Sequence, residues 1–260
     1  LAPSGEPALG PPAFMHRPSS VDDLAAPLGH HWQDASHVSF GVATAGLVWN
    51  RLKIEASAFN GREPDQNRWN FDFAPLQSYS ARITANPTAH WSLTAGFGFI
   101  KSPETRDAGH SMHRALAAAQ YGRALSAQRQ FAASVIWGGM SHSDHAGVLN
   151  SLLAEAEVAD EERGSVFARA EFVQKTADDL ALPATTAIDP ERSFDLGSLS
   201  IGGVRTVSRT TRTNLGLGAR FSLNLVGGEL EPTYGGRVTG GIMVFLRLRP
   251  RRSAPMAVAH

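Results

Sequence analysis

Hydrophobic and polar residues alternate with a period of two along most of the chain after His37. In the stretch 214–225, one face is apolar and consists of Leu215, Leu217, Ala219, Phe221, Leu223 and Leu225. The other face is polar or glycine and consists of Asn214, Gly216, Gly218, Arg220, Ser222 and Asn224. Because successive side chains of a strand point to opposite faces, this stretch predicts a strand between an apolar and a polar environment.

Similar alternation predicts about eleven strands. We place them at 37–49, 51–60, 71–85, 90–100, 111–122, 129–141, 147–158, 164–176, 193–208, 212–225 and 236–249. Two of these regions, 111–125 and 147–162, are rich in Ala, Leu and Glu, which also favour helix. We interpret both as strands because of the connections around them.

The predicted strands are long and their connections alternate in length. Strands of soluble proteins usually have about 5–6 residues, whereas a tilted membrane-spanning strand needs about 9–11. Short connections lie at 50–51, 86–89, 123–128, 159–163 and 209–211, and longer ones at 61–70, 101–110, 177–192 and 226–235. Only the brief connection at 142–146 breaks this order. Short turns at one rim and longer loops at the other are typical of outer-membrane barrels.

The pattern therefore predicts an all-β protein, an antiparallel up-and-down transmembrane β-barrel over residues 37–249 with a carboxyl-terminal tail at 250–260. Aromatic residues near strand ends or on apolar faces fit an interfacial girdle. They are Trp49, Phe59, Trp91, Phe99, Tyr121, Phe131, Trp137 and Phe245. The alternative is a soluble β-sandwich or α+β protein, in which these aromatics and the apolar faces would form an internal core.

Residues 1–36 are predicted to be an irregular segment with a short helical turn at about 21–26, capped by Ser19 or Ser20. We expect this segment to fold into the lumen as a constriction or to cover the rim. An odd number of strands is unusual for bacterial single-chain barrels. It predicts that the sequence is the carboxyl-terminal part of a longer barrel, with apolar residues on the convex face of an incomplete sheet. The alternative is a further strand within 1–36, against which its prolines argue.

Four segments resemble a family of mostly unannotated, exported bacterial outer-membrane β-barrel proteins. They are 5–17 (GEPALGPPAFMHR), 30–34 (HHWQD), 55–65 (EASAFNGREPD) and 243–248 (MVFLRL). The family is similar to outer-membrane proteins found beside heavy-metal (copper) resistance genes, and its members are often longer at the amino terminus. The resemblance implies the outer membrane of a Gram-negative bacterium, with lipid as a partner. It implies no catalytic residue at any position of this sequence.

Composition narrows the function classes. The chain has 24 Lys+Arg and 24 Asp+Glu, so its zero net charge gives no general attraction to nucleic acid. Cysteine is absent, which excludes disulfides, thiolate metal sites and cysteine nucleophiles. The sequence contains no Gly-x-Ser-x-Gly, phosphate-binding loop or His-Glu-x-x-His motif. We therefore predict that the protein is not an enzyme, with an outer-membrane hydrolase left open as a lesser alternative.

Charged and amide side chains on the polar strand faces are predicted to line a lumen, because a charge that faces lipid is costly. The predicted pore-lining residues are Lys53, Glu55, Arg82, Arg114, Gln120, Arg169, Glu171, Arg220, Asn224, Arg237 and Arg247. The excess of arginine favours a mild preference for anions. The alternative is a rigid, salt-bridged lumen that conducts nothing.

Histidines in the irregular start and in the predicted loops supply a second hypothesis. Short-range groups suited to Cu or Zn are His30 with His31, His110 with His113, and His142 with Asp144 and His145. Solvent-exposed loop histidines with no ligand are the simpler interpretation, so no cofactor is expected.

We predict a passive pore or an envelope structural component that contacts small solutes and binds no nucleic acid. The alternatives are a metal-interacting outer-membrane protein and a soluble β-rich binding protein.

Overall fold

Twelve strands and four short helical turns make up the protein in a computed structural model that describes residues 1–34, 39–62, 67, 69–72, 74–101, 109–143, 147–182 and 188–250. The strands are β1 (Ala2–Gly5), β2 (Ser39–Trp49), β3 (Leu52–Phe59), β4 (Ser78–Ala85), β5 (Trp91–Lys101), β6 (Ser111–Ala124), β7 (Arg129–His142), β8 (Leu149–Asp160), β9 (Gly164–Thr176), β10 (Ser193–Arg209), β11 (Thr213–Val226) and β12 (Val238–Pro250). The helical turns are η1 (Phe14–His16), α1 (His30–Gln33), η3 (Gly228–Leu230) and α2 (Glu231–Tyr234).

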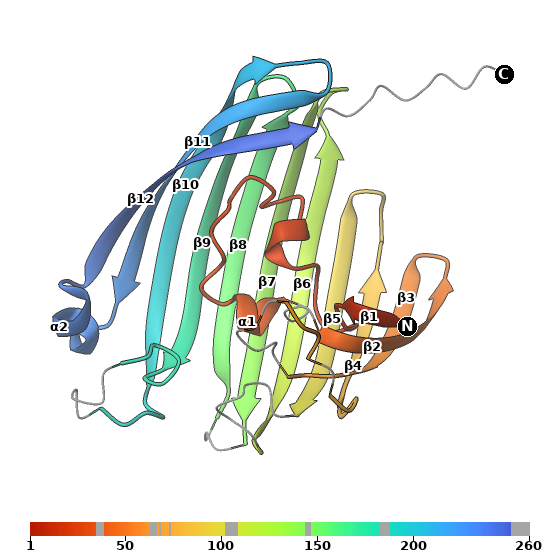
Figure 1. Ribbon diagram of the computed structural model, residues 1–260, viewed down its shortest axis with the longest axis vertical. Helices are drawn as coiled ribbons and strands as arrows, with labels where there is room; N and C mark the ends of the chain where they lie inside the picture. The colour runs from red at the N-terminus through yellow and green to blue at the C-terminus, as the bar shows by residue number, and fades with distance from the viewer. Residues whose placement is uncertain are drawn as a thin grey trace.

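All twelve strands form one antiparallel sheet in sequence order, so each pairs with its neighbours along the chain. Among the described residues, β1 and β12 are the two edges of the sheet. Figure 1 shows that the sheet curves into a trough and that residues 6–34, with α1, cross its concave side. We call this space the lumen and residues 6–34 the lumen segment. The predicted antiparallel, up-and-down all-β fold is confirmed.

The apolar faces of the strands point outward. Phe221 in β11 and Ile242 in β12 are register partners with 54% and 73% of their surfaces exposed, whereas the adjacent Arg220 is 9% exposed and faces the lumen. A soluble protein of this size would bury such residues in a core. The prediction of an apolar convex face is confirmed, and the alternative with inward apolar faces is wrong.

The two rims differ as the connection lengths predict. Residues 50–51, 86–90, 125–128, 161–163 and 210–212 join strands at one rim, which we call the short-turn rim. In the tightest of these turns Asn50 has a φ of 54°, a left-handed conformation that asparagine tolerates. The opposite ends of the strands, together with η3 and α2, form the long-loop rim (Figure 1).

Three local predictions were wrong. Residues 2–5 form β1, which pairs with β2 from Ala2 opposite Val42 to Gly5 opposite Ser39. The segment 1–36 is therefore not wholly irregular, and the odd strand count on which the incomplete barrel was predicted does not hold. Residues 21–26 are not helical, and the turns form instead at Phe14–His16 and His30–Gln33. The strand expected at 71–85 starts only at Ser78, because Pro75 cannot donate to a sheet.

The helix-favouring regions 111–125 and 147–162 are strands β6 and β8, as interpreted. In β8, Leu152 and Val158 are exposed on the convex face, while Glu155 and Glu157 are buried on the concave face. Cross-strand pairing with β7 and β9 outweighs the intrinsic helix propensity of these residues.

An apolar core fills the lumen toward the long-loop rim. Leu9 and Trp32 of the lumen segment are fully or almost fully buried there against inward side chains such as Leu116, Met140 and Val173. The inner face of the sheet is thus apolar where it packs against Leu9 and Trp32. None of the helices in the described part of the chain has the length and apolar content needed to cross a membrane.

Two aromatics that were expected in the outer girdle belong to the inner face. Phe59 is fully buried in the core. Phe245 lies over Gly218, where a Cβ would be 2.4 Å from its ring. Phe167 is also on the inner face; it is 2% exposed and lies over Gly202, where a Cβ would be 2.5 Å from its ring.

Candidate functional site

The lumen segment lies so close to the wall that glycines are required beneath it. A Cβ on Gly96 of β5 would lie 1.7 Å from the carbonyl oxygen of Leu9, and one on Gly138 of β7 would lie 2.2 Å from that of Trp32. Both contacts are with backbone, which cannot rotate away. Because glycine has no side chain, the backbone at Leu9 and Trp32, the two main apolar residues of the segment, can pack directly against the wall.

Arg17 is the buried centre of the polar contacts. Its Nε donates to Glu155 of β8 at 2.8 Å, and its Nη1 donates to Asp34 and to the carbonyl oxygen of Pro12. Burial by itself lowers the pKa of the guanidinium, but the carboxylates of Asp34 and Glu155 raise the pKa above its ordinary value. Arg17 therefore stays charged at every ordinary pH and ties the segment to the wall.

Ser19 continues this attachment. Its Oγ donates to Glu155 at 2.9 Å and lies 2.7 Å from the Oγ of Ser134 in β7. Glu155 also accepts from Nε of Arg169 in β9 at 3.0 Å. Glu155 and Ser19 together thus join the lumen segment to three strands of the wall.

Asp22 and Asp23 connect the segment to the last strands of the sheet. Asp22 accepts from Arg249 at 2.8 Å and also from Arg247 and Ser165. Asp23 pairs with Arg220 at 3.0 Å and with Arg169 at 3.3 Å. The four arginines come from β9, β11 and β12, so two adjacent carboxylates span this whole part of the wall.

Further contacts hold the two ends of the segment. Near its start, the Ala8 N–H donates to Ser57 Oγ at 2.8 Å, and Arg82 donates to the Gly10 carbonyl at 2.7 Å. Arg82 also pairs with Glu55 at 2.8 Å.

Toward the end of the segment, Arg114 donates to the Asp34 carbonyl at 2.7 Å, and the Leu28 N–H donates to Glu171 at 2.5 Å. The ammonium of Lys175 lies 5.3 Å from the centre of the Trp32 ring. The segment is therefore attached along its whole length.

The structure brings most of the predicted pore-lining residues together around the lumen segment. Those that contact the segment directly are Arg82, Arg114, Arg169, Glu171, Arg220 and Arg247. Glu55 reaches it through Arg82, and Lys53 pairs with Glu55 at 2.9 Å with its own side chain 46% exposed.

The remaining three predicted positions lie apart from that network. Gln120 lines a cavity beside the segment. Asn224 accepts from Ser198 at 2.9 Å. Arg237 is exposed between α2 and β12 at the long-loop rim.

Sequence reasoning missed the partners that complete this network. They are Arg17, Asp22, Asp23, Asp34, Glu155, Glu157 and Arg249. Glu155 and Glu157 alternate with the apolar face of β8, so their inward direction was readable from the strand pattern. The roles of Arg17, Asp22 and Asp23 were not, because the segment that carries them has no repeating pattern.

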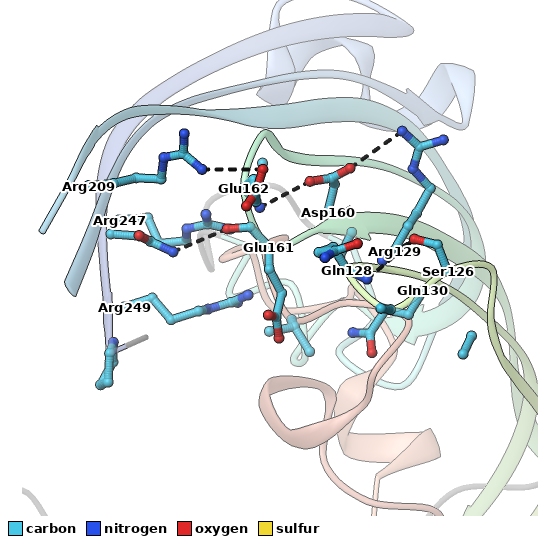
Figure 2. A pocket seen from close by; sticks show the side chains of 17 residues that line it. Ser126, Gln128, Arg129, Gln130, Asp160, Glu161, Glu162, Arg209, Arg247 and Arg249 are labelled. Carbon is cyan, nitrogen blue, oxygen red and sulfur yellow. Dashed lines mark hydrogen bonds and ion pairs between the residues drawn. The ribbon is translucent and has the colours of Figure 1, made fainter. Parts of the chain in front are cut away.

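Two cavities separate the segment from the wall at the short-turn rim. The larger has a volume of about 990 Å³ and is lined by Val21, short-turn residues and the arginines 129, 209, 247 and 249 (Figure 2). Arg129 pairs with Asp160 at 3.4 Å and Arg209 with Glu162 at 3.5 Å. The smaller cavity, of about 450 Å³, lies between Pro18, Ser19 and the wall residues Gln120 and Ser134. The lumen thus has cavities at this rim, the larger of them lined by charged residues, and is filled by apolar side chains near the other rim.

The histidines do not gather at one place among the described residues. His30 and His31 lie in α1 within the lumen, and the two rings are 4.2 Å apart. His113 lies on the convex face near Phe97 and Phe99, with ring distances of 5.8 and 5.3 Å. His110 precedes β6 and His142 ends β7.

Asp144 and His145 lie outside the described residues. Within the described ranges, no three His, Asp or Glu side chains form a group that could hold a metal ion. The copper or zinc hypothesis therefore stays a prediction.

Comparisons with known proteins identify the type of fold. No protein-family model matches the sequence, and no curated protein matches it. Among solved structures, the chain is similar to an anion-selective porin from Comamonas acidovorans, with a TM-score of 0.50 and 12% sequence identity. The match covers 84% of this chain and 62% of the porin chain, so the chain spans about three fifths of that porin's length. The likeness shows the porin-type sheet, and the link to copper-resistance proteins has no support in these comparisons.

Proposed function

We propose that the protein is an outer-membrane β-barrel protein of a Gram-negative bacterium and acts as a narrow passive pore for small hydrophilic solutes. The observation that carries this proposal is the inverted polarity of the sheet. Apolar side chains cover the convex face, while arginines and glutamates are buried on the concave face. Only a lipid environment makes that arrangement favourable, because each charge at the bilayer midplane costs about 2–4 kcal/mol when it faces lipid.

Aromatic side chains on the convex face support the same location. Near the short-turn rim, Trp91, Tyr121 and Phe131 form a row with ring distances of 5.0 and 6.0 Å. Toward the long-loop rim, Tyr79 stacks on Phe99 at 5.1 Å. Two such bands are the arrangement that lipid headgroup regions favour at the two faces of a membrane.

The lumen segment limits what can pass. It fills the lumen near the long-loop rim with apolar side chains, and it leaves cavities at the short-turn rim. The solved porin is described as anion-selective. For this chain we expect weak selectivity, because the wall arginines that face the lumen segment are paired with carboxylates.

Planar lipid bilayers test the proposal directly. Purified protein refolded in detergent is added to one side, and single-channel currents in potassium chloride are recorded. Discrete, ohmic conductance steps are the expected result. Protein that folds into vesicles and never conducts would contradict the pore and leave the second candidate, an envelope structural component, which the fully anchored lumen segment favours. Partitioning into water as a folded monomer would contradict both.

A further inference from the structure

We infer that Asp22 and Asp23 occupy a carboxylate-binding site built into the inner wall, and that small carboxylate solutes bind this site in their place. The site consists of Arg169, Arg220, Arg247 and Arg249. The inference rests on the proposed pore function, because the pore is the route by which solutes would reach this site. The two aspartates act as an internal competitor that keeps the site filled.

The geometry is that of carboxylate recognition. Asp22 is bound by two guanidinium groups of β12 and by the hydroxyl of Ser165. Asp23 is bound by guanidinium groups of β11 and β9. Guanidinium groups match a carboxylate in charge and in planar hydrogen-bond geometry. Since these donors belong to the wall and not to the lumen segment, they remain in place when the segment moves.

The site is reachable from water. Arg247 and Arg249 line the 990 Å³ cavity at the short-turn rim together with Val21, the residue before the two aspartates (Figure 2). Val21 is 37% exposed and Leu24, on the other side of the aspartates, is 53% exposed. The two aspartates are therefore buried against the wall, while the residues on either side of them are exposed.

Charge explains why the aspartates control access. Asp22 and Asp23 neutralise arginines that would otherwise give this part of the lumen a positive potential and attract anions. The Asp22 N–H also donates to the buried Glu157 of β8 at 3.1 Å, which fixes the aspartate beside the wall. With the segment in place, a solute anion meets an occupied site.

Isothermal titration with succinate, a small dicarboxylate, tests the site without any assumption about conductance. The test protein is the full chain with Asp22→Asn and Asp23→Asn, which keeps side-chain size and removes both charges. Since a tethered competitor is lost, we expect this variant to bind succinate at least about tenfold more tightly than the unchanged protein. Succinamide, which is uncharged, should not bind.

Two further variants control this measurement. Glu162→Gln removes a carboxylate of the same cavity that pairs with exposed Arg209, and it should leave succinate affinity unchanged. Adding Arg247→Gln and Arg249→Gln to the double asparagine variant should abolish binding. Equal affinity in the unchanged and the double asparagine protein, with circular dichroism confirming the fold of both, would overturn the inference.

A disulfide tests whether the segment must withdraw. Ser19 and Ser134 have their Oγ atoms 2.7 Å apart, and the chain contains no cysteine, so Ser19→Cys with Ser134→Cys gives a single reversible tether. Oxidation should abolish whatever succinate binding the reduced protein shows. The control pair Thr210→Cys and Thr213→Cys, whose Oγ1 atoms are 2.9 Å apart in a turn, should have no effect. Unchanged binding in the oxidised protein would contradict withdrawal and overturn the inference.

Bilayer recordings separate this inference from the pore itself. In a potassium chloride gradient, the double asparagine variant should show a several-fold higher anion-to-cation permeability ratio than the unchanged protein. Succinate binding without any conductance would support the site and contradict the pore. Conductance with the same permeability ratio and no succinate binding would support the pore and overturn the site.

Discussion

At the scale of single residues, the attachment of the lumen segment depends most on Arg17. Its side chain is fully buried and its guanidinium lies between Glu155 and Asp34. We expect Arg17→Ala to lower the free energy of unfolding by about 3–5 kcal/mol, because it removes a buried cationic partner from the two buried carboxylates of Glu155 and Asp34. Urea titration of the protein in lipid vesicles measures this change.

The matched control is Arg209→Ala. Arg209 and Glu162 form an ion pair with both side chains about half exposed, so its loss should cost less than about 1 kcal/mol. Equal losses for the two variants would contradict the central role of Arg17.

The pH dependence of the Arg17 contribution follows from its raised pKa. A cation with a raised pKa in the folded protein stabilises it below the unfolded pKa and loses that effect only as the pH rises through the folded value. Since both values lie above the working range, the loss caused by Arg17→Ala should be the same at about pH 6 and pH 10. A loss that shrinks toward pH 10 would show that the guanidinium titrates there.

A second prediction at the residue scale concerns Gly138, which lies beneath the lumen segment. Gly138→Ala should push Trp32 away from β7, because the new Cβ would contact backbone and not a flexible side chain. Overpacking of this kind costs about 1–3 kcal/mol. Hydrogen exchange of residues 6–34 should therefore be about tenfold faster or more, while that of β8 and β9 stays unchanged. Gly122→Ala is the control, since a Cβ there has nothing within 4 Å.

At the scale of elements, alternation predicted the direction of side chains well but their partners poorly. Arg169 and Arg220 point inward because their neighbours in sequence are apolar, and a period of two is enough to show that. The contact of both arginines with Asp23 could not be predicted from the sequence. The lumen segment has no repeating hydrophobic pattern, and its path depends on glycines of the wall, such as Gly96 and Gly138, on which its backbone packs. β1 was missed for a related reason, since four residues are too few to show alternation.

Strand orientation gives a prediction at this same scale. Phe221→Arg places a charge on the convex face at mid-strand, and should lower the stability of the membrane-inserted protein by about 2–4 kcal/mol. Val238→Arg, at the first residue of β12 and 59% exposed on the same sheet, should cost only about 0–1 kcal/mol. Urea-dependent folding into vesicles measures both, and equal costs would contradict a bilayer around the sheet.

At the scale of the whole molecule, the wall and the lumen segment have separate tasks. The strands pair with one another through backbone hydrogen bonds, and the segment adds only side-chain and loop contacts to the inner face. Replacing residues 8–33 by a short Gly/Ser linker should therefore keep the β-structure and raise single-channel conductance several-fold, because the segment no longer narrows the lumen. An unchanged conductance would show that the segment does not narrow the path.

The early position of the lumen segment in the chain has a consequence for the order of folding. Arg17 finds Glu155 138 residues further on, and Asp22 finds Arg249 227 residues further on. Contacts of such separation form late, because the chain between the partners must be ordered first. The lumen segment precedes the wall strands in the chain but is therefore among the last parts to reach its final place, and the lumen stays unfilled until β12 has joined the sheet. A protein stalled before that step would expose its arginine-lined interior to solvent.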